Sequence, residues 1–244
     1  MQSVAAMARQ FLRAAVGQSV YGRLKQAYWR RVPDGYLRRV SGVIHVGANA
    51  GQERENYARQ GLDVVWIEAL PEAFAELQAN LAGYPRQRAY QRLVTDEEGR
   101  EYRFRVANNE GQASSIYELA GHRRMWPEVQ YTRELRLRST TLSAMLREEG
   151  IEAGRYQALV LDTQGSELLV LRGAVEALAN FRYIKAEAAD FEMYEGGCRA
   201  DEVTEFLAQH GFAERRRDVV RAMAGVGTCY EILYRRTEAR RGGG

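Results

Sequence analysis

The sequence predicts an α/β fold with a mostly parallel sheet, a C-terminal antiparallel hairpin and a small β insertion. Two observations carry this prediction. From residue 41 onward, short apolar runs alternate with segments of helical periodicity, as in β-α-β units. Near the C-terminus, two strand-like runs follow each other without a helix between them, which indicates an antiparallel pair.

The individual elements follow from residue spacing. Continuous apolar runs predict buried strands, and apolar residues three or four positions apart predict helices. In chain order, strands are expected at 43–46, 64–68, 89–94, 158–161, 183–186, 212–217 and 229–235, and helices at 53–60, from Pro71, at 141–149, 167–179 and 201–209. Apolar and basic residues alternate near 102–106 and 135–138, which is typical of one-sided strands. These two runs bracket an irregular stretch and so predict the insertion.

Three segments are expected along the chain. Residues 1–40 form a basic helical segment, residues 41–236 the main domain, and residues 237–244 a disordered tail. The basic helix packs its apolar stripe on the main domain or lies on an anionic membrane surface, and the sequence leaves both alternatives open.

Composition narrows the class of protein. The 244 residues carry a net charge of only +3, and no stretch interleaves aromatic with basic residues, so a nucleic-acid partner is not expected. The two cysteines, Cys198 and Cys229, have neither metal-ligand nor redox spacing and fit a reducing compartment. No apolar run is long enough to span a bilayer, and no secretory signal is apparent. We expect a cytoplasmic protein, membrane-peripheral if residues 1–40 act as an anchor; the oligomeric state is not indicated.

The densest functional signal is Val43–Gly51, a strand that ends in a glycine-rich turn, followed by Val64–Glu68, a strand that ends in a carboxylate. Glycines let a backbone approach a ligand closely, and a carboxylate can accept hydrogen bonds from both hydroxyls of a ribose. The turn reads G-x-x-x-G and lacks the G-x-G-x-x-G spacing of a dinucleotide site. We therefore expect an adenosine ligand without phosphates, namely the methyl donor S-adenosylmethionine.

Ligands of open parallel sheets bind beyond the carboxyl ends of the strands. The residues expected to bind the donor there are His45, Gly47, Asn49, Gly51, Glu68, Thr95, Asp96 and Asp162. Glu68 is expected to hold the ribose and Asp96 the adenine edge. For His45, which lies within the first strand, a packed and hydrogen-bonded core histidine is the alternative.

Asp162 and Glu187 end adjacent strands and are the expected catalytic carboxylates. Asp162 should face the donor sulfur, where it could hold the donor's amino group, ligate a cation or orient the substrate. The two carboxylates would share Mg2+ if a metal is present, and the metal would make the acceptor hydroxyl more acidic. Without a metal, one carboxylate or His122 is the expected general base. Gln164 should form hydrogen bonds, and Tyr194 should line the acceptor side.

Several separated blocks resemble the FkbM family of S-adenosylmethionine-dependent methyltransferases. The blocks are His45–Glu53, Trp66–Pro71, Asn108–Ile116, Leu161–Ala174, Glu187–Gly196 and Gly225–Tyr230. The resemblance implies a Rossmann-like class I methyltransferase fold and O-methylation of a hydroxyl on a sugar, a glycan or a secondary metabolite. It also implies that the glycine-rich turn contacts the methionine portion of the donor. Ser114 and Ser115, in a segment similar to the family's Gly-x-x-Ser-Ser motif, are expected on the acceptor side. The chain departs from the family at His45 and Gln164, where many members carry acids.

Other functions remain compatible with the sequence. A protein that retains the adenosine site but has lost catalysis could act as a partner in a biosynthetic assembly. A membrane-peripheral enzyme could act on lipid-linked glycans through the basic helix. A nicotinamide enzyme is disfavoured, because a dinucleotide oxidoreductase would normally end with another parallel strand rather than a hairpin. No residue pattern in the predicted insertion identifies the acceptor.

Overall fold

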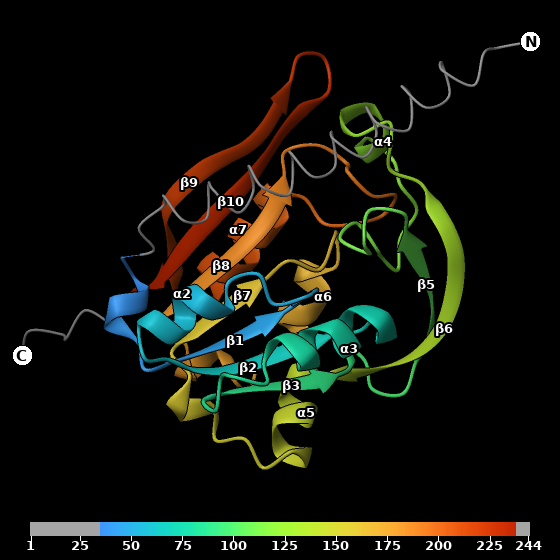
Figure 1. Ribbon diagram of the computed structural model, residues 1–244. Helices are drawn as coiled ribbons and strands as arrows, with labels where there is room; N and C mark the ends of the chain where they lie inside the picture. Colours follow the sequence, from blue (N-terminus) through green and yellow to red (C-terminus); the bar gives the residue numbers. More distant parts are fainter. Residues whose placement is uncertain (1–34, 238–244) are drawn as a thin grey trace, which may run out of the picture. The chain divides into compact units, whose positions relative to one another are not determined.

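The computed structural model describes residues 35–237 (Figure 1). The predicted basic helix therefore lies outside the described residues, except for 35–40, and so does the predicted tail beyond Thr237. The short 3-10 helix η1 (Leu37–Arg39) leads into the sheet. No helix within residues 35–237 is both long and apolar enough to cross a membrane.

A seven-stranded sheet in the order β3-β2-β1-β7-β8-β10-β9 forms the centre of the fold. Its strands are β1 (Gly42–Val46), β2 (Asp63–Glu68), β3 (Gln87–Gln91), β7 (Ala158–Leu161), β8 (Tyr183–Ala189), β9 (Phe212–Met223) and β10 (Gly227–Arg236). The first five strands are mutually parallel, whereas β10 pairs antiparallel with both β8 and β9. The predicted mostly parallel sheet with a C-terminal hairpin is confirmed.

The register brings the carboxyl ends of the parallel strands to one edge. Val46 pairs with Ile67 of β2 and with Leu161 of β7, and Leu161 pairs with Ala186 of β8. The residues that follow these positions are therefore level with one another, as the strand-end argument requires.

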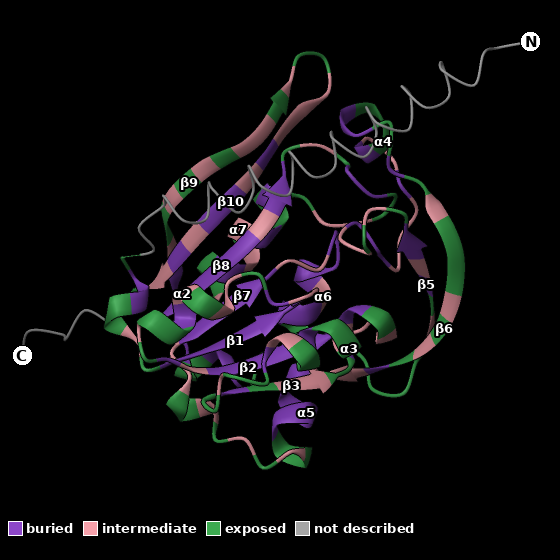
Figure 2. Cartoon of the chain, in the orientation of Figure 1, coloured by how far each residue is buried: buried purple, intermediate pink, exposed green. Residues whose placement is uncertain are grey.

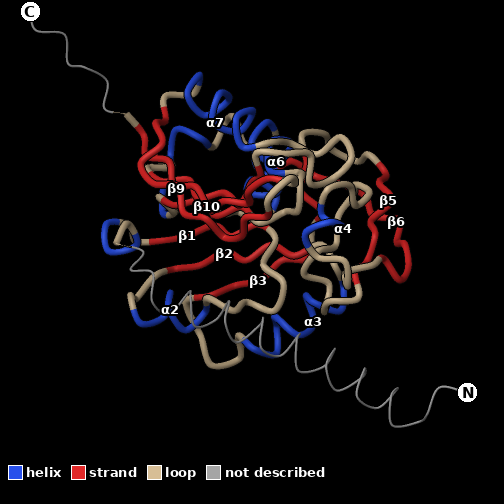
Figure 3. Tube along the Cα trace, turned by 90° about the horizontal axis from the view of Figure 1, so that it is seen from above, coloured by secondary structure: helices blue, strands red, loops and turns tan. Residues whose placement is uncertain are grey.

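Helices cover both faces of the sheet, as the view along it shows (Figure 3). On one face lie α2 (Arg54–Arg59) and α3 (Pro71–Asn80), which bury Tyr57 and Leu77 in one apolar cluster. On the other lie α5 (Leu142–Glu148), α6 (Glu167–Arg172) and α7 (Ala200–Gln209), which contribute to a second cluster. Strands β1, β2 and β7 are buried almost throughout (Figure 2), which explains their continuous apolar sequences, whereas the edge strand β3 is only partly buried.

The predicted insertion is a three-stranded sheet of β4 (Leu93–Thr95), β6 (Tyr131–Thr141) and β5 (Glu101–Ala107), in that order. The run expected as one strand at 89–94 is instead divided between β3 and β4, because β4 leaves the central sheet to pair with β6. Phe104 and Val106 of β5 pack on Leu70 and Ala73, at the start of α3. The short helix α4 (His122–Met125) lies between β5 and β6 in the chain.

Two other elements differ from expectation. The helix expected at 167–179 ends at Arg172, because Gly173 passes so close to β4 that a Cβ there would lie 2.0 Å from the Thr95 carbonyl oxygen. The chain continues through a 3-10 turn, η3 (Leu178–Asn180). Strand β8 runs on to Ala189 because β10 pairs along its whole length, so Glu187 lies inside the strand rather than just past its end.

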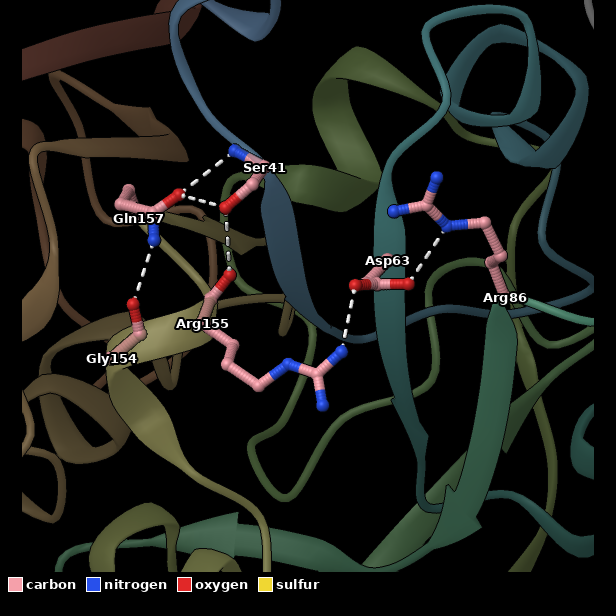
Figure 4. Close-up of polar contacts among 6 residues, drawn as sticks. All are labelled: Ser41, Asp63, Arg86, Gly154, Arg155 and Gln157. Carbon is pink, nitrogen blue, oxygen red and sulfur yellow. Dashed lines mark hydrogen bonds and ion pairs between the residues drawn. The ribbon is translucent and has the colours of Figure 1, made fainter.

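The opposite, amino-terminal edge of the sheet is held by a polar network (Figure 4) that includes the short turn η2 (Ala153–Arg155). The backbone N–H and the hydroxyl of Ser41 both donate to Gln157 Oε1, each at 2.8 Å. The Asp63 carboxylate accepts from Arg86 at 2.9 Å and from Arg155 at 3.2 Å, and the hydrogen bond from Arg86 lowers the pKa of Asp63. These groups bond to one another, which indicates a structural role.

Candidate active site

The turn between β1 and α2 is built from three residues in the left-handed backbone region: Gly47 (φ 82°), Asn49 (φ 45°) and Gly51 (φ 70°). The N–H groups of Gly47 and Ala48 donate to the Ile67 carbonyl oxygen at 2.9 and 3.1 Å, which anchors the turn to β2. A Cβ on Gly47 would lie 1.9 Å from the Asp162 carbonyl oxygen. Only glycine therefore allows the turns after β1 and β7 to lie this close together.

Glu68 holds this turn from the end of β2. Its Oε2 accepts from the Asn49 N–H at 2.7 Å and its Oε1 from the Leu70 N–H at 2.8 Å, and the residue is only 7% exposed. Burial raises the pKa of Glu68, the backbone hydrogen bonds oppose this shift, and the charge of Asp162 adds to it. The two carboxylates thus lie close enough for their charges to interact. The carboxylate oxygens of Glu68 together offer about four acceptor positions, more than their backbone donors occupy, as a ribose diol requires.

The insertion is tied to the same turn. The Asn49 side chain donates through Nδ2 to the Glu110 carbonyl oxygen at 3.0 Å and accepts from Gln52 Nε2 at 2.8 Å. Glu110 itself has φ 58°. Sequence reasoning missed Glu110 as part of the site, although the turn-forming run Asn109-Glu110-Gly111 was a signal for a tight reversal at this point.

The turn after β7 carries the expected catalytic residues. The Asp162 N–H donates to the Val46 carbonyl oxygen at 3.0 Å, and Asp162 Oδ1 accepts from Gln164 Nε2. The Tyr194 hydroxyl donates to Gln164 Oε1. The buried Glu167 carboxylate accepts from the Thr163 N–H at 2.8 Å and the Gly165 N–H at 3.0 Å, so it holds the turn from the first turn of α6. The structure thus brings Asp162, Gln164 and Tyr194 together.

The two serines expected on the acceptor side form internal hydrogen bonds. Ser114 Oγ accepts from the Ala107 N–H at 3.1 Å. Ser115 Oγ donates to the Gln164 carbonyl oxygen at 2.7 Å and accepts from the Tyr117 N–H at 3.1 Å. The bond from Ser115 attaches the segment after β5 to the Asp162 turn, whereas the bond to Ser114 stabilises that segment internally.

Glu187 lies half-buried on β8 and accepts a long hydrogen bond from Cys229 Sγ of β10 at 3.6 Å. Its charge and that of Asp162 add to the effect of burial in raising the pKa of Tyr194. Among residues 35–237, no group of three or more His, Cys, Asp or Glu side chains is arranged to hold a metal ion. A cation between Asp162 and Glu187 would therefore depend on water and substrate for its other ligands.

His122 begins α4 and is 5% exposed, with its ring stacked on Trp126 (centroids 4.7 Å apart) and tilted against Tyr194 (5.5 Å). Burial, with a smaller effect from the charge of Arg221, lowers the pKa of His122 to about 4. The ring is therefore neutral at pH 7. Its position beside Tyr194 places it next to the cluster around Asp162.

The remaining donor-site candidates are His45, Thr95 and Asp96. The His45 ring stacks on Trp66 at 4.9 Å, and its Nδ1 is 3.3 Å from the Tyr57 hydroxyl, an arrangement that matches the packed alternative. Thr95 is fully buried at the end of β4, where its hydroxyl donates to the Glu97 carbonyl oxygen at 3.2 Å. Asp96 is exposed in the following loop.

Comparison with known proteins identifies the family. Residues 45–213 match the model of the methyltransferase FkbM domain. The chain is 26% identical over 162 residues to the 2-O-methyltransferase NoeI of Sinorhizobium fredii NGR234, a match that covers 63% of this chain and 65% of the relative. The chain thus spans just under two thirds of that relative's length.

Solved structures were also compared. The 1,6-didemethyltoxoflavin-N1-methyltransferase of Burkholderia thailandensis, with bound S-adenosylhomocysteine, is 12% identical with a TM-score of 0.49 and covers 98% of this chain and 92% of its own. Magnesium protoporphyrin IX methyltransferase of Synechocystis PCC 6803, with bound SAM, is 12% identical with a TM-score of 0.47 and covers 91% and 80%.

The family match spans most of the chain and includes the turn after β1, Glu68 and the Asp162 turn. The sheet order observed here agrees with the Rossmann-like class I methyltransferase fold that the family resemblance implied. The chain belongs to the FkbM methyltransferase domain family.

Proposed function

We propose that the protein is an S-adenosylmethionine-dependent O-methyltransferase that acts on a hydroxyl of a sugar, a glycan or a secondary metabolite. The observation that carries the proposal is the buried Glu68 carboxylate, held by two backbone N–H groups beside a left-handed glycine turn. Membership in a methyltransferase family and the likeness to a 2-O-methyltransferase support methyl transfer to oxygen.

The residues of the crevice fit the donor. Glu68 would accept from the two ribose hydroxyls, and Asp162 would face the ammonium group. The turn after β1 would enclose the methionine portion, as the family resemblance implied. Gly47 and Gly51 permit the shape of this turn, because Cβ atoms there would meet Asp162 and Leu77. The bound donor supplies an electrophilic sulfonium methyl group.

The chain's own residues must align the acceptor hydroxyl and take its proton. Alignment is the larger contribution, because it converts an encounter between two molecules into a reaction within one complex. Asp162, Glu187 and His122 remain the candidate proton acceptors. Of these, His122 with a pKa of about 4 would be available in its neutral form at pH 7 but would bind the proton only weakly. An ordinary carboxyl group has a pKa of about 4 as well, so basicity does not rank the three candidates, and their position relative to the acceptor hydroxyl decides between them.

Methyl transfer from radiolabelled donor to a panel of hydroxylated sugars, glycans and phenolic metabolites tests the proposal. We expect label in at least one acceptor, and we expect Asp162→Ala to abolish transfer. A matched control is Asp201→Ala, which removes an exposed carboxylate at the start of α7 and should leave transfer unchanged. Transfer within a few-fold of the parent in Asp162→Ala would reject the role of Asp162.

Further measurements separate the alternatives. Donor binding without transfer to any hydroxyl would favour a protein that has lost catalysis and serves as a partner in a biosynthetic assembly. A fluorescence change of NADH on mixing would favour a nicotinamide enzyme. Co-sedimentation with anionic liposomes that is lost without residues 1–40 would favour a membrane-peripheral enzyme.

A further inference from the structure

We propose that Tyr194 and Gln164 form a hydrogen-bond relay that orients Asp162 for donor binding, which makes Tyr194 a positioning residue rather than an acceptor contact. The inference rests on the proposed function, because the group to be met by Asp162 is the donor's ammonium. The relay has two bonds: the Tyr194 hydroxyl donates to Gln164 Oε1, and Gln164 Nε2 donates to Asp162 Oδ1.

An amide suits the middle position of this relay. It accepts at one end and donates at the other, whereas an ionised carboxylate only accepts. A glutamate at position 164 would therefore present a like charge to Asp162 and could not donate to it. The relay thus explains why position 164 carries a glutamine in this chain, where the family pattern has an acid.

Gln164 is held in place at its backbone as well. Its φ of 55° is in the left-handed region, which is unfavourable for a non-glycine residue and persists only where surrounding contacts enforce it. The hydrogen bond from Ser115 Oγ to its carbonyl oxygen, at 2.7 Å, is one such contact. Gln164 is therefore fixed by three partners that come from three different segments of the chain.

Tyr194 is equally immobile. It is 1% exposed, and Cβ atoms built on Gly165 or Gly197 would lie 3.0 Å from its side chain, so both glycines are in close contact with it. Its backbone forms a bridge with Leu119, and the His122 ring packs against its ring. Burial also raises the pKa of Tyr194 well above its ordinary value, so the hydroxyl keeps the proton that it donates.

The relay therefore fixes the orientation of the Asp162 carboxylate, which lies just after the carboxyl end of β7. The backbone carbonyl of Asp162 itself makes the close contact with Gly47, and the charge of the Asp162 side chain acts on Glu68. In the proposed complex the two carboxylates divide the donor between them: Glu68 takes the ribose and Asp162 the ammonium. Losing the relay should weaken the second contact and leave the first unchanged.

Isothermal titration with two probes tests this division. S-adenosylhomocysteine carries the amino-acid portion, whereas 5′-methylthioadenosine has the ribose and adenine without it. We expect Tyr194→Phe and Gln164→Glu to lower the affinity for S-adenosylhomocysteine by about three- to tenfold, the value of one hydrogen bond. Both variants should bind 5′-methylthioadenosine within about twofold of the parent.

The matched control is Tyr234→Phe. Tyr234 is also fully buried, and its hydroxyl lies 2.8 Å from Thr204 Oγ1, but it pairs with Ile184 at the other end of β8. This variant loses a comparable buried hydrogen bond, and both affinities should stay unchanged. In an Asp162→Asn background, Tyr194→Phe should add less than about a twofold effect, because residues that act as a unit are not additive.

Three results would overturn the relay: parental affinity of Tyr194→Phe for S-adenosylhomocysteine, equal losses for both probes, or an undiminished Tyr194→Phe effect in the Asp162→Asn background. Failure of the parent protein to bind either probe would instead refute the proposed function, and the relay with it.

Discussion

Replacement of Glu68 by alanine is the sharpest perturbation of the donor site. A hydrogen bond to a charged group contributes about 1.5–3 kcal/mol net, so the two bonds expected from the ribose hydroxyls amount to roughly 3–6 kcal/mol. Water that enters the emptied volume recovers part of this energy. We therefore expect the affinity for S-adenosylhomocysteine to fall by at least about tenfold, which corresponds to about 1.4 kcal/mol.

The same change also affects folding. It leaves the Asn49 and Leu70 N–H groups without their acceptor, at a cost of about 1 kcal/mol each where water can reach them. Burial raises the pKa of Glu68 above its ordinary value of 4.5, so the folded protein binds this proton more tightly than the unfolded chain does. The stability that the group contributes therefore falls as the pH rises from about 4.5 toward the raised pKa. Glu68→Ala should lower the melting temperature by a few degrees at pH 7, roughly 4–8 °C at most.

Isothermal titration of the parent, Glu68→Ala and Glu68→Gln gives the comparison. The glutamine keeps the volume and one acceptor oxygen, so its affinity should lie between the other two. Glu148→Ala, which removes an exposed acid from the last turn of α5, is the control. Unchanged affinity in Glu68→Ala, with the protein folded, would refute the assignment of the ribose site.

Three further predictions concern the surroundings of the donor site. Gly47→Ala should lower the free energy of unfolding, measured in urea, by more than about 2 kcal/mol, because its Cβ would lie 1.9 Å from the Asp162 carbonyl oxygen. Gly83→Ala is the control, since Gly83 has open space around it and the change should alter stability by less than about 0.5 kcal/mol. Equal effects of the two substitutions would contradict this prediction. The pKa of His122, lowered by burial from 6.5 to about 4, predicts that stability falls as the pH drops through this interval and that His122→Phe flattens the dependence in thermal unfolding. A shared Mg2+ at Asp162 and Glu187 requires that EDTA lower methyl transfer and that added Mg2+ restore it; transfer that persists in EDTA would contradict the metal assignment.

The parallel strands and their ends could be predicted from the sequence because burial on both faces produces continuous apolar runs. The first polar residue after such a run then marks the crevice, as Glu68 and Asp162 do. The break between β3 and β4 could not be predicted. It arises because β4 pairs with β6, which lies more than thirty residues further along the chain.

The contacts within the site could not be predicted from the sequence either. Tyr194 meets Gln164 across 30 residues and Ser115 meets it across 49, and no local pattern records either pairing. His45 illustrates the same point, since its ring contacts Trp66 and Tyr57, whose positions depend on the packing of α2 against the sheet. Residue type indicated that these side chains were polar or aromatic, but only the fold determines their partners.

A co-crystal structure with S-adenosylhomocysteine and magnesium tests the central claim most directly. It should show the nucleoside in the crevice between the turns after β1 and β7, with both ribose hydroxyls within hydrogen-bond distance of Glu68 and the amino group facing Asp162. A crevice that stays empty, or a ligand bound elsewhere on the protein, would contradict the account.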